Sequence, residues 1–536
     1  MEGRGRSDRS VVMKADPILP HGRGVADFLA HHGDKVTGVV SGYDRLRLQG
    51  TLRGLYAQDL FEIYLSRVGV LFKNYATHVK EVSGRLCDAA DEIARQGGTA
   101  VHFIRSPKTR KEDLVAEALR AHPKSEGLVA VLSATEPCRT WKMHGNWRTK
   151  RLEPRLESSK CLHLYFYFIH EVFGLMQLRL QTWFPFLVHF CLNGREWLCR
   201  QLQREGIAYE RADNCLPWIE DLSRAQALLD AQTKTPFHNY LPELIKRYHP
   251  SHQRLHDIVP IDYYWTVAES EYATDLMFRD RASVQAVYPS LVHHAIMNFG
   301  SKDVLRFLGH KQVGDNRVES SLLTREEGTR VKHWVNHNSV KVYDKGSILR
   351  TECTINVAEA FRVWRPSERD PKGPKAWRYM RRAVADMPRR AEVSRAANDR
   401  YVGALAAVAN PQRLNQLVPA VCRPITRKGR RYRALNVFNP ADAALLTVVN
   451  HGDFVLHGLR NRDLRDRLYP QPPAGLTNRQ LTARVSRQLA LLHAHGLIAR
   501  VSKTHLYRVT KKGRTLITST LAAGQANIEQ LTKLAA

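Results

Sequence analysis

Apolar residues recur at helical spacing near the C-terminal end of the chain. Between residues 477 and 494, leucine or valine stands at every third or fourth position, which predicts a long helix with one apolar face. Cap residues and apolar spacing predict two shorter helices before it, at 441–449 and 462–468, and two short strands after it, at 497–501 and 505–509. Two helices, a long helix and a two-stranded wing form the element order of a DNA-binding winged helix.

Basic side chains gather away from the apolar face of that long helix and in the segments around it. The cations expected to contact bases or phosphates are Arg479, Arg484, Arg487, Lys503, Arg427, Lys428, Arg430 and Arg431. The predicted unit, residues 439–520, resembles the winged helix of the MarR class of regulators, and a basic linker at 411–438 precedes it. The alternative is a helical domain whose arginines form only a solvated face.

Alternating apolar residues predict strands through much of the remaining chain. Residues 34–150 are predicted to form an α/β domain, in which the first two strands meet at a turn over 42–45. Residues 151–365 are predicted to form a central antiparallel α+β domain that contains a helix at 186–203. The strands predicted in this domain are 162–169, 175–183, 264–278, 329–334, 339–343 and 348–355.

The segments on either side of these domains are basic. Residues 1–33 are polar and lack periodicity, which predicts a flexible tail. Residues 376–410 predict a basic helical connector to the C-terminal unit. The expected fold class is therefore a multidomain α+β protein, with an N-terminal α/β unit, a central antiparallel sheet unit and a C-terminal winged helix.

The net charge of the chain indicates the class of its partner. Its 536 residues carry a formal net charge of +30, which favours a polyanionic partner, first of all nucleic acid. No stretch reaches the roughly 18 uncharged apolar residues of a membrane span, and no apolar signal core is present, so we expect a cytoplasmic protein. The 8 cysteines form no C-x-x-C pair, which makes structural zinc and disulfides improbable.

Candidate chemistry gathers in the central domain. The carboxylates predicted to hold Mg²⁺ or Mn²⁺ are Glu352, Asp344, Glu271 and Asp275, with His163, His333 or His337 beside them. Such an ion can polarise a phosphodiester for attack. Arg350 and Lys345 complete the predicted catalytic set, with Arg350 expected to hold the scissile phosphate. The alternative assigns the charged residues here to cross-strand ion pairs on a wet sheet face: Lys341, Asp344, Lys345, Arg350 and Glu352.

Several stretches resemble a bacterial family usually labelled hypothetical or MarR-like, over residues 36–405. They are VSGYDRLRLQGTLRG, CLHLYFYFIHEVFG, QTWFPFLVHFCLNGREWL, EYATDLMFR and NSVKVYDKGSILRTECTIN. The Y-D-K followed by L-R-x-E is also similar to a strand pair of rolling-circle replication initiators from phages and plasmids. That resemblance implies a metal on an antiparallel sheet and a tyrosine on a following helix that attacks DNA. Tyr401 is the expected nucleophile, with Tyr379 as the weaker choice, while the paired histidines of those initiators are absent.

Asp44, near the end of the first predicted strand, resembles the leading acidic residue of RNase-H-like nucleases. The alternative is a turn aspartate that caps local amides.

These observations predict a DNA-binding protein of a mobile or replicating element. A metal-dependent nicking, replication-initiator or transposase-like activity of the central domain is expected, in which the winged helix finds a site and the central domain binds or cuts a strand. Two alternatives stay open: a non-enzymatic MarR-like regulator, and an RNA-binding partner of a structured RNA. The chain contains no P-loop, G-x-G-x-x-G or G-x-S-x-G motif, so nucleotide hydrolysis and acyl transfer lack support.

Overall fold

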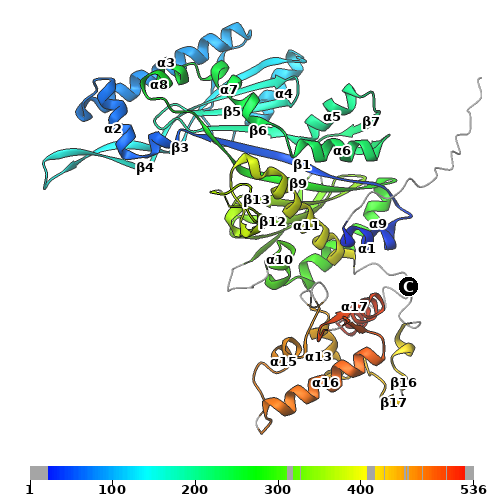
Figure 1. Cartoon of the computed structure of the whole chain (residues 1–536). Coiled ribbons are helices and arrows are strands. Elements are labelled where there is room, and N and C mark those ends of the chain that lie inside the picture. Colours follow the sequence, from blue (N-terminus) through cyan, green and yellow to red (C-terminus); the bar gives the residue numbers. More distant parts are fainter. Residues whose placement is uncertain are drawn as a thin grey trace, which may run out of the picture.

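The structure, a computed structural model, is a mixed α+β fold built on one large sheet (Figure 1). The described residues are 22–310, 318–325, 328–367, 369–406, 417–427, 429–451, 454, 458–473, 475–502 and 504–525. Lys428 and Lys503, two of the cations predicted to bind DNA, and most of the predicted tail lie outside them.

The sheet has 11 strands, and only the pair β2–β3 is parallel. In spatial order the strands are β10 (Glu319–Arg325), β11 (Gly328–Val335), β12 (Asn338–Asp344), β13 (Ile348–Ile355), β9 (Tyr264–Phe278), β1 (Val36–Thr51), β6 (Val188–Asn193), β5 (Gly174–Gln181), β4 (Arg151–His170), β3 (Gly127–Asn146) and β2 (Val101–Phe103). Strand β1, from the N-terminal part of the chain, therefore lies in the middle of the sheet, between β9 and β6.

One face of the sheet is apolar and the other is largely polar. Side chains alternate along a strand, so Tyr272 and Leu276 of β9 point to one face while Glu271 and Asp275 point to the other. The helices that belong to this part of the chain are α1 (Arg23–His32), α2 (Gln58–Arg67), α3 (Tyr75–Gln96), α4 (Lys111–Ala121), α5 (Gly194–Arg204), α6 (Leu222–Gln232), α7 (Phe237–Tyr248), α8 (Ser251–Ile258), α9 (Arg281–Asn298), α10 (Ser301–Phe307) and α11 (Met387–Leu405).

Two large cores hold several of these helices against the apolar face. One core joins α3 and α7 to β4, β5 and β6, and the other joins α9, α10 and α11 to β9, β12 and β13. On the opposite face, α4 packs against the two buried tyrosines of β4, Tyr165 and Tyr167. Helix α5 and the small hairpin of β7 (Tyr209–Ala212) and β8 (Cys215–Ile219) lie beside β1, where β6 ends.

The C-terminal unit has a core of its own. It contains a hairpin of β16 (Ile425–Arg427) and β17 (Arg430–Tyr432), then α13 (Pro440–Val449), α15 (Asn461–Leu468), α16 (Asn478–Ala494), β18 (Ile498–Arg500), β19 (Tyr507–Val509) and α17 (Lys511–Gln525). Within the described residues, the elements from α13 to β19 follow the order helix, helix, long helix and two strands. A capping box between Thr477 and Gln480 begins α16.

Three local predictions are wrong. The turn predicted at 42–45 is part of the continuous strand β1, because Tyr43 packs on Tyr272 of β9 and the strand is paired over most of its length. The helix predicted at 186–203 is strand β6 followed by α5, since Val188, Phe190 and Leu192 are buried with a period of two. Residues 23–32, predicted to be flexible, form α1, which packs on α11.

The predicted domain boundaries fall inside the fold. The boundary at residue 150 lies in the turn of the β3–β4 hairpin, so the two predicted domains share one sheet. The predicted connector at 376–410 contains strand β15 (Ala376–Tyr379) and helix α11, and α11 packs on β9 and β13. Among the described residues, no helix is both long enough and apolar enough to cross a membrane.

Candidate metal centre

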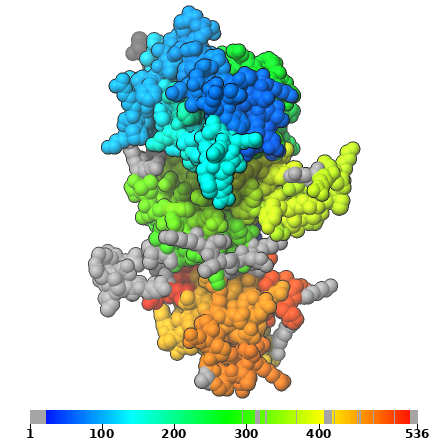
Figure 2. Space-filling view, turned by 90° about the vertical axis from the view of Figure 1, so that its left-hand side faces the viewer, coloured from blue at the N-terminus to red at the C-terminus, as the bar shows by residue number. Residues whose placement is uncertain are grey.

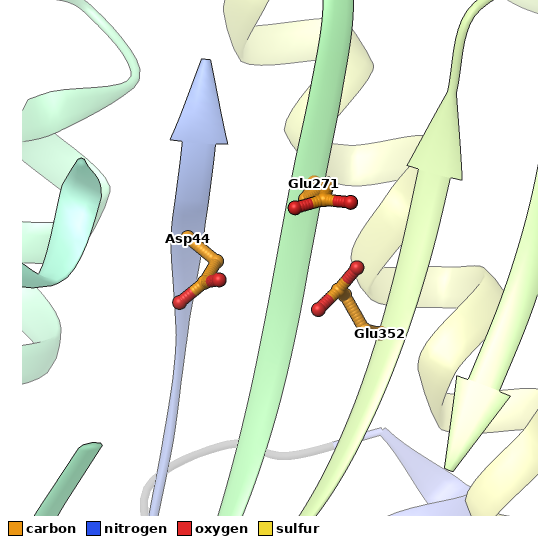
Figure 3. A group of neighbouring side chains, drawn as sticks. All are labelled: Asp44, Glu271 and Glu352. Carbon is orange, nitrogen blue, oxygen red and sulfur yellow. The ribbon is translucent and has the colours of Figure 1, made fainter. Parts of the chain in front are cut away.

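Three carboxylates meet on the polar face of the sheet. Asp44 of β1, Glu271 of β9 and Glu352 of β13 come from adjacent strands and point toward one another (Figure 3). One ligand oxygen of each lies within 4.8 Å of the others. Oxygen ligands at this spacing suit Mg²⁺ or Mn²⁺, which prefer carboxylates.

A β-bulge brings Asp44 into this group. Tyr43 pairs with Tyr272 and Arg45 pairs with Glu271, so two steps along β1 match one step along β9 and Asp44 is the extra residue. Bulges re-aim side chains and are common beside active sites. The bulge places Asp44 on the polar face, where it accepts a hydrogen bond from Arg350.

A lysine lies between two of the three carboxylates. The Nζ of Lys341 on β12 is 3.0 Å from Oε1 of Glu271 and 2.5 Å from Oε1 of Glu352. The register pairs Lys341 directly with Glu352, and the hydroxyl of Tyr343 donates to the other oxygen of Glu352. The cross-strand ion pair that formed the alternative prediction is therefore present, but it is buried instead of wet.

The pKa values of the three carboxyl groups are shifted in different directions. Burial raises the pKa of Asp44. Burial and the neighbouring charge of Glu352 raise the pKa of Glu271. Burial acts in the same direction on Glu352, but Lys341 and the Tyr343 hydroxyl outweigh it and lower the pKa of Glu352 to about 2. Glu352 is therefore ionised at neutral pH, and a divalent cation would favour the ionised forms of Asp44 and Glu271.

A second buried network lies directly beside the three carboxylates. Arg350 donates from Nε and Nη2 to the two oxygens of Asp275, at 2.6 and 2.8 Å, and from Nη1 to Asp44 at 2.8 Å. Arg195 of α5 is 2.9 Å from Asp275. These two guanidinium groups outweigh the effect of burial and lower the pKa of Asp275. Because its donors are engaged in these bonds and it is 1% exposed, Arg350 cannot serve as the predicted phosphate holder.

The structure separates other predicted residues from the centre. Asp344 accepts from the backbone N–H of Gly346 in the β12–β13 turn, and Lys345 pairs with Asp213. The three candidate histidines stand elsewhere: His163 contacts the Cys161 carbonyl, His333 contacts Ser320, and His337 has positive φ in the β11–β12 turn. Two of the four predicted carboxylates, Glu271 and Glu352, belong to the group of three. Asp275 lies beside this group and pairs with Arg195 and Arg350.

Tyr401 lies on the other side of the sheet, in the apolar core. Its ring packs against Phe299 and Phe307, and it is 0% exposed. Burial raises its pKa well above the ordinary value, which disfavours the phenolate that an attack on DNA would require. The arginines on either side point elsewhere, since Arg395 donates to Tyr272 and Arg400 donates to the Phe307 carbonyl.

The predicted DNA-contacting arginines are exposed. Arg479, Arg484 and Arg487 lie on the exposed side of α16, opposite the buried Leu481 and Val485. The described cations of the basic linker lie exposed on the β16–β17 hairpin: Arg427, Arg430 and Arg431. Arg427 also donates to the His493 carbonyl, which ties the hairpin to the C-terminal end of α16.

Comparison of the chain with protein-family models, with curated protein sequences and with solved structures gave no match.

Proposed function

We propose that this chain binds nucleic acid and cleaves a phosphodiester with a divalent cation held by Asp44, Glu271 and Glu352. The observation that carries the proposal is the meeting of these three carboxylates on a polar sheet face in a chain of net charge +30. A strongly basic chain attracts a phosphate backbone, and a carboxylate-held cation can polarise a phosphodiester for cleavage.

Water is the nucleophile in this proposal. Tyr401 is buried in the core, and the Tyr343 hydroxyl donates to Glu352. A cation held there would supply Lewis-acid chemistry: it would polarise a phosphate oxygen and lower the pKa of a water molecule. The water oxygen would bond to phosphorus as the bond from phosphorus to the leaving oxygen breaks, and the proton that the water loses would pass through solvent to the leaving oxygen. Tyr343 and Lys341 would hold Glu352 in place, and the Lys341 ammonium would stand near the developing negative charge.

The C-terminal unit is proposed to be a winged helix that binds duplex DNA through α16. Its element order and the exposed arginines of α16 support this role. A second basic surface stands at the tip of the long β3–β4 hairpin, which projects from the sheet in Figure 1 and faces the viewer in Figure 2. Its exposed cations are Arg148, Lys150, Arg151 and Arg155. A mobile or replicating element as the source of the DNA stays a prediction.

Replacing both Arg484 and Arg487 with alanine is expected to weaken duplex binding without unfolding the chain. Both side chains are exposed, and removing an arginine that hydrogen-bonds to a base edge costs on the order of 1 to 3 kcal/mol of binding free energy. The measurement is a gel-shift titration of duplex DNA at several salt concentrations. The matched control is Arg95→Ala, which removes an exposed arginine of α3 paired with Glu92. Equal affinities for wild type and the double variant would remove α16 from the interface.

One observation favours the non-enzymatic regulator. Lys341 already pairs with both Glu271 and Glu352, so the centre can also be read as a buried ion-pair cluster. The proposal is tested by incubating the full chain with end-labelled single-stranded and duplex DNA or RNA in Mn²⁺ or in EDTA. Cleavage in Mn²⁺ alone supports the enzyme. Binding without cleavage in any divalent metal would favour the regulator, and preference for structured RNA would favour the RNA-binding alternative.

A further inference from the structure

A small hairpin carries an unusual set of exposed rings. Strands β14 (Arg362–Arg365) and β15 (Ala376–Tyr379) pair so that Trp364 lies opposite Trp377 and Arg362 lies opposite Tyr379. Since side chains alternate along a strand, these four residues share one face of the hairpin. We call them the ring face.

The ring face is turned to solvent while the other face of the hairpin is anchored. Trp364, Trp377 and Tyr379 are 53%, 56% and 57% exposed, whereas Val363, between Arg362 and Trp364, is 5% exposed and packs in the core beneath α11. The hairpin stands out from the body of the molecule as the yellow-green projection in Figure 2. Large exposed apolar groups gathered at one place mark binding surfaces.

The geometry of the rings suits flat ligands, and the charge around them suits anions. The Trp364 and Trp377 centroids are 5.6 Å apart with planes at 65°, and the Arg362 guanidinium lies 4.8 Å from the Tyr379 ring centroid. Among the described residues of the hairpin and its connection, the exposed charged ones are mostly cations: Arg362, Arg369, Lys372, Lys375 and Arg378, against Asp370. Nucleobases supply a flat π face and their backbone supplies negative charge.

The hairpin is joined directly to the strand that carries Glu271. Just after β15, Ala383 forms a β-bridge with Thr266 of β9, and the backbone N–H of Val267 donates to the Arg382 carbonyl at 2.7 Å. Val267 precedes Glu271 by four residues, which is about 13 Å along an extended strand. The hairpin is therefore anchored to the same strand that carries Glu271.

We propose that the ring face binds the unpaired bases of single-stranded nucleic acid. Bases of a duplex are stacked inside it and cannot lie on these rings, whereas a single strand can stack on them without regard to sequence. The inference rests on the nucleic-acid-binding part of the proposed function and is independent of cleavage.

The test is the affinity of the full chain for a fluorescent oligothymidylate, measured by anisotropy in EDTA so that no cleavage occurs. Trp377→Ala and Tyr379→Ala are each expected to weaken binding on the order of 10-fold to 100-fold, as loss of one stacked base does. Trp377→Phe keeps a ring and should retain most of the affinity. Trp218→Ala, at an exposed tryptophan of β8, is the matched control and should bind like wild type.

A second ligand separates stacking from charge and from a purely structural role. An abasic oligomer of the same length keeps the phosphates but lacks the bases, so wild type should bind it more weakly and the ring variants should bind it as wild type does. Ring variants that bind oligothymidylate as tightly as wild type would overturn the inference. An equal loss of affinity for oligothymidylate and for the abasic oligomer would also overturn it. If the ring variants lose single-strand affinity but the wild type cleaves nothing, the inference stands and the proposed cleavage fails.

Discussion

Glu352→Gln is expected to reduce Mn²⁺-dependent cleavage on the order of 10³-fold. A carboxylate-held cation stabilises the transition state by several kcal/mol, and each ~1.4 kcal/mol of that stabilisation corresponds to a factor of ten in rate. Lys341 and the Tyr343 hydroxyl lower the pKa of Glu352 to about 2, so this carboxylate is ionised at neutral pH. Glutamine keeps the shape of the side chain but removes that charge. The measurement is single-turnover cleavage of end-labelled DNA in Mn²⁺.

The matched control for this experiment is Glu269→Gln. Glu269 lies on the same strand and the same face as Glu271, but it pairs with the exposed Arg45 and Arg47 and lies outside the carboxylate group. Its variant should cleave like wild type. We expect circular dichroism and heat unfolding of Glu352→Gln to match wild type, because Lys341 retains Glu271 as a partner. Full cleavage by Glu352→Gln would remove this carboxylate from the mechanism.

The second large effect is on stability. Arg350→Met is expected to lower the free energy of unfolding by about 3 to 5 kcal/mol, the range for removing one partner of a buried ion pair. Arg350 is buried and donates hydrogen bonds to both Asp275 and Asp44, so its removal leaves two buried carboxylates with less compensation. Arg195 still faces Asp275 and limits the destabilisation. The measurement is equilibrium unfolding in urea.

Arg47→Met is the control for position and charge. Arg47 lies on β1 in the same sheet, but its side chain is 44% exposed and pairs with Glu269. An exposed pair contributes roughly 0 to 1 kcal/mol, so this variant should unfold at nearly the wild-type urea concentration. Equal destabilisation by both substitutions, or none by Arg350→Met, would show that the buried network does not hold the sheet together.

The elements predicted well from sequence are those specified by local patterns. Strands at 264–278 and 348–355 have the predicted bounds, because their alternation is long and their ends carry turn residues. Asn336 and His337 adopt positive φ in the predicted β11–β12 turn, a conformation that asparagine tolerates. The C-terminal helices followed from cap residues and apolar spacing for the same reason.

The elements predicted poorly depend on partners far along the chain. Gly42 and Asp44 are common turn residues, yet β1 is held extended by β9, more than 200 residues later, and by β6. The carboxylate centre could be predicted only in part for the same reason. Glu271 and Glu352 are among the predicted ligands, but the bulge that adds Asp44 and the cross-strand pairing that engages Asp275 with Arg350 arise only when the strands pair.

The central claim is that Asp44, Glu271 and Glu352 together hold one divalent cation. It is tested most directly by titrating the full chain with Mn²⁺ and measuring the concentration of free ion by electron paramagnetic resonance. We expect one saturable Mn²⁺ site per chain in wild type and in Glu269→Gln. We expect this site to be lost in both Asp44→Asn and Glu352→Gln. No saturable site in wild type, or a site that persists unchanged in both carboxylate variants, would contradict it.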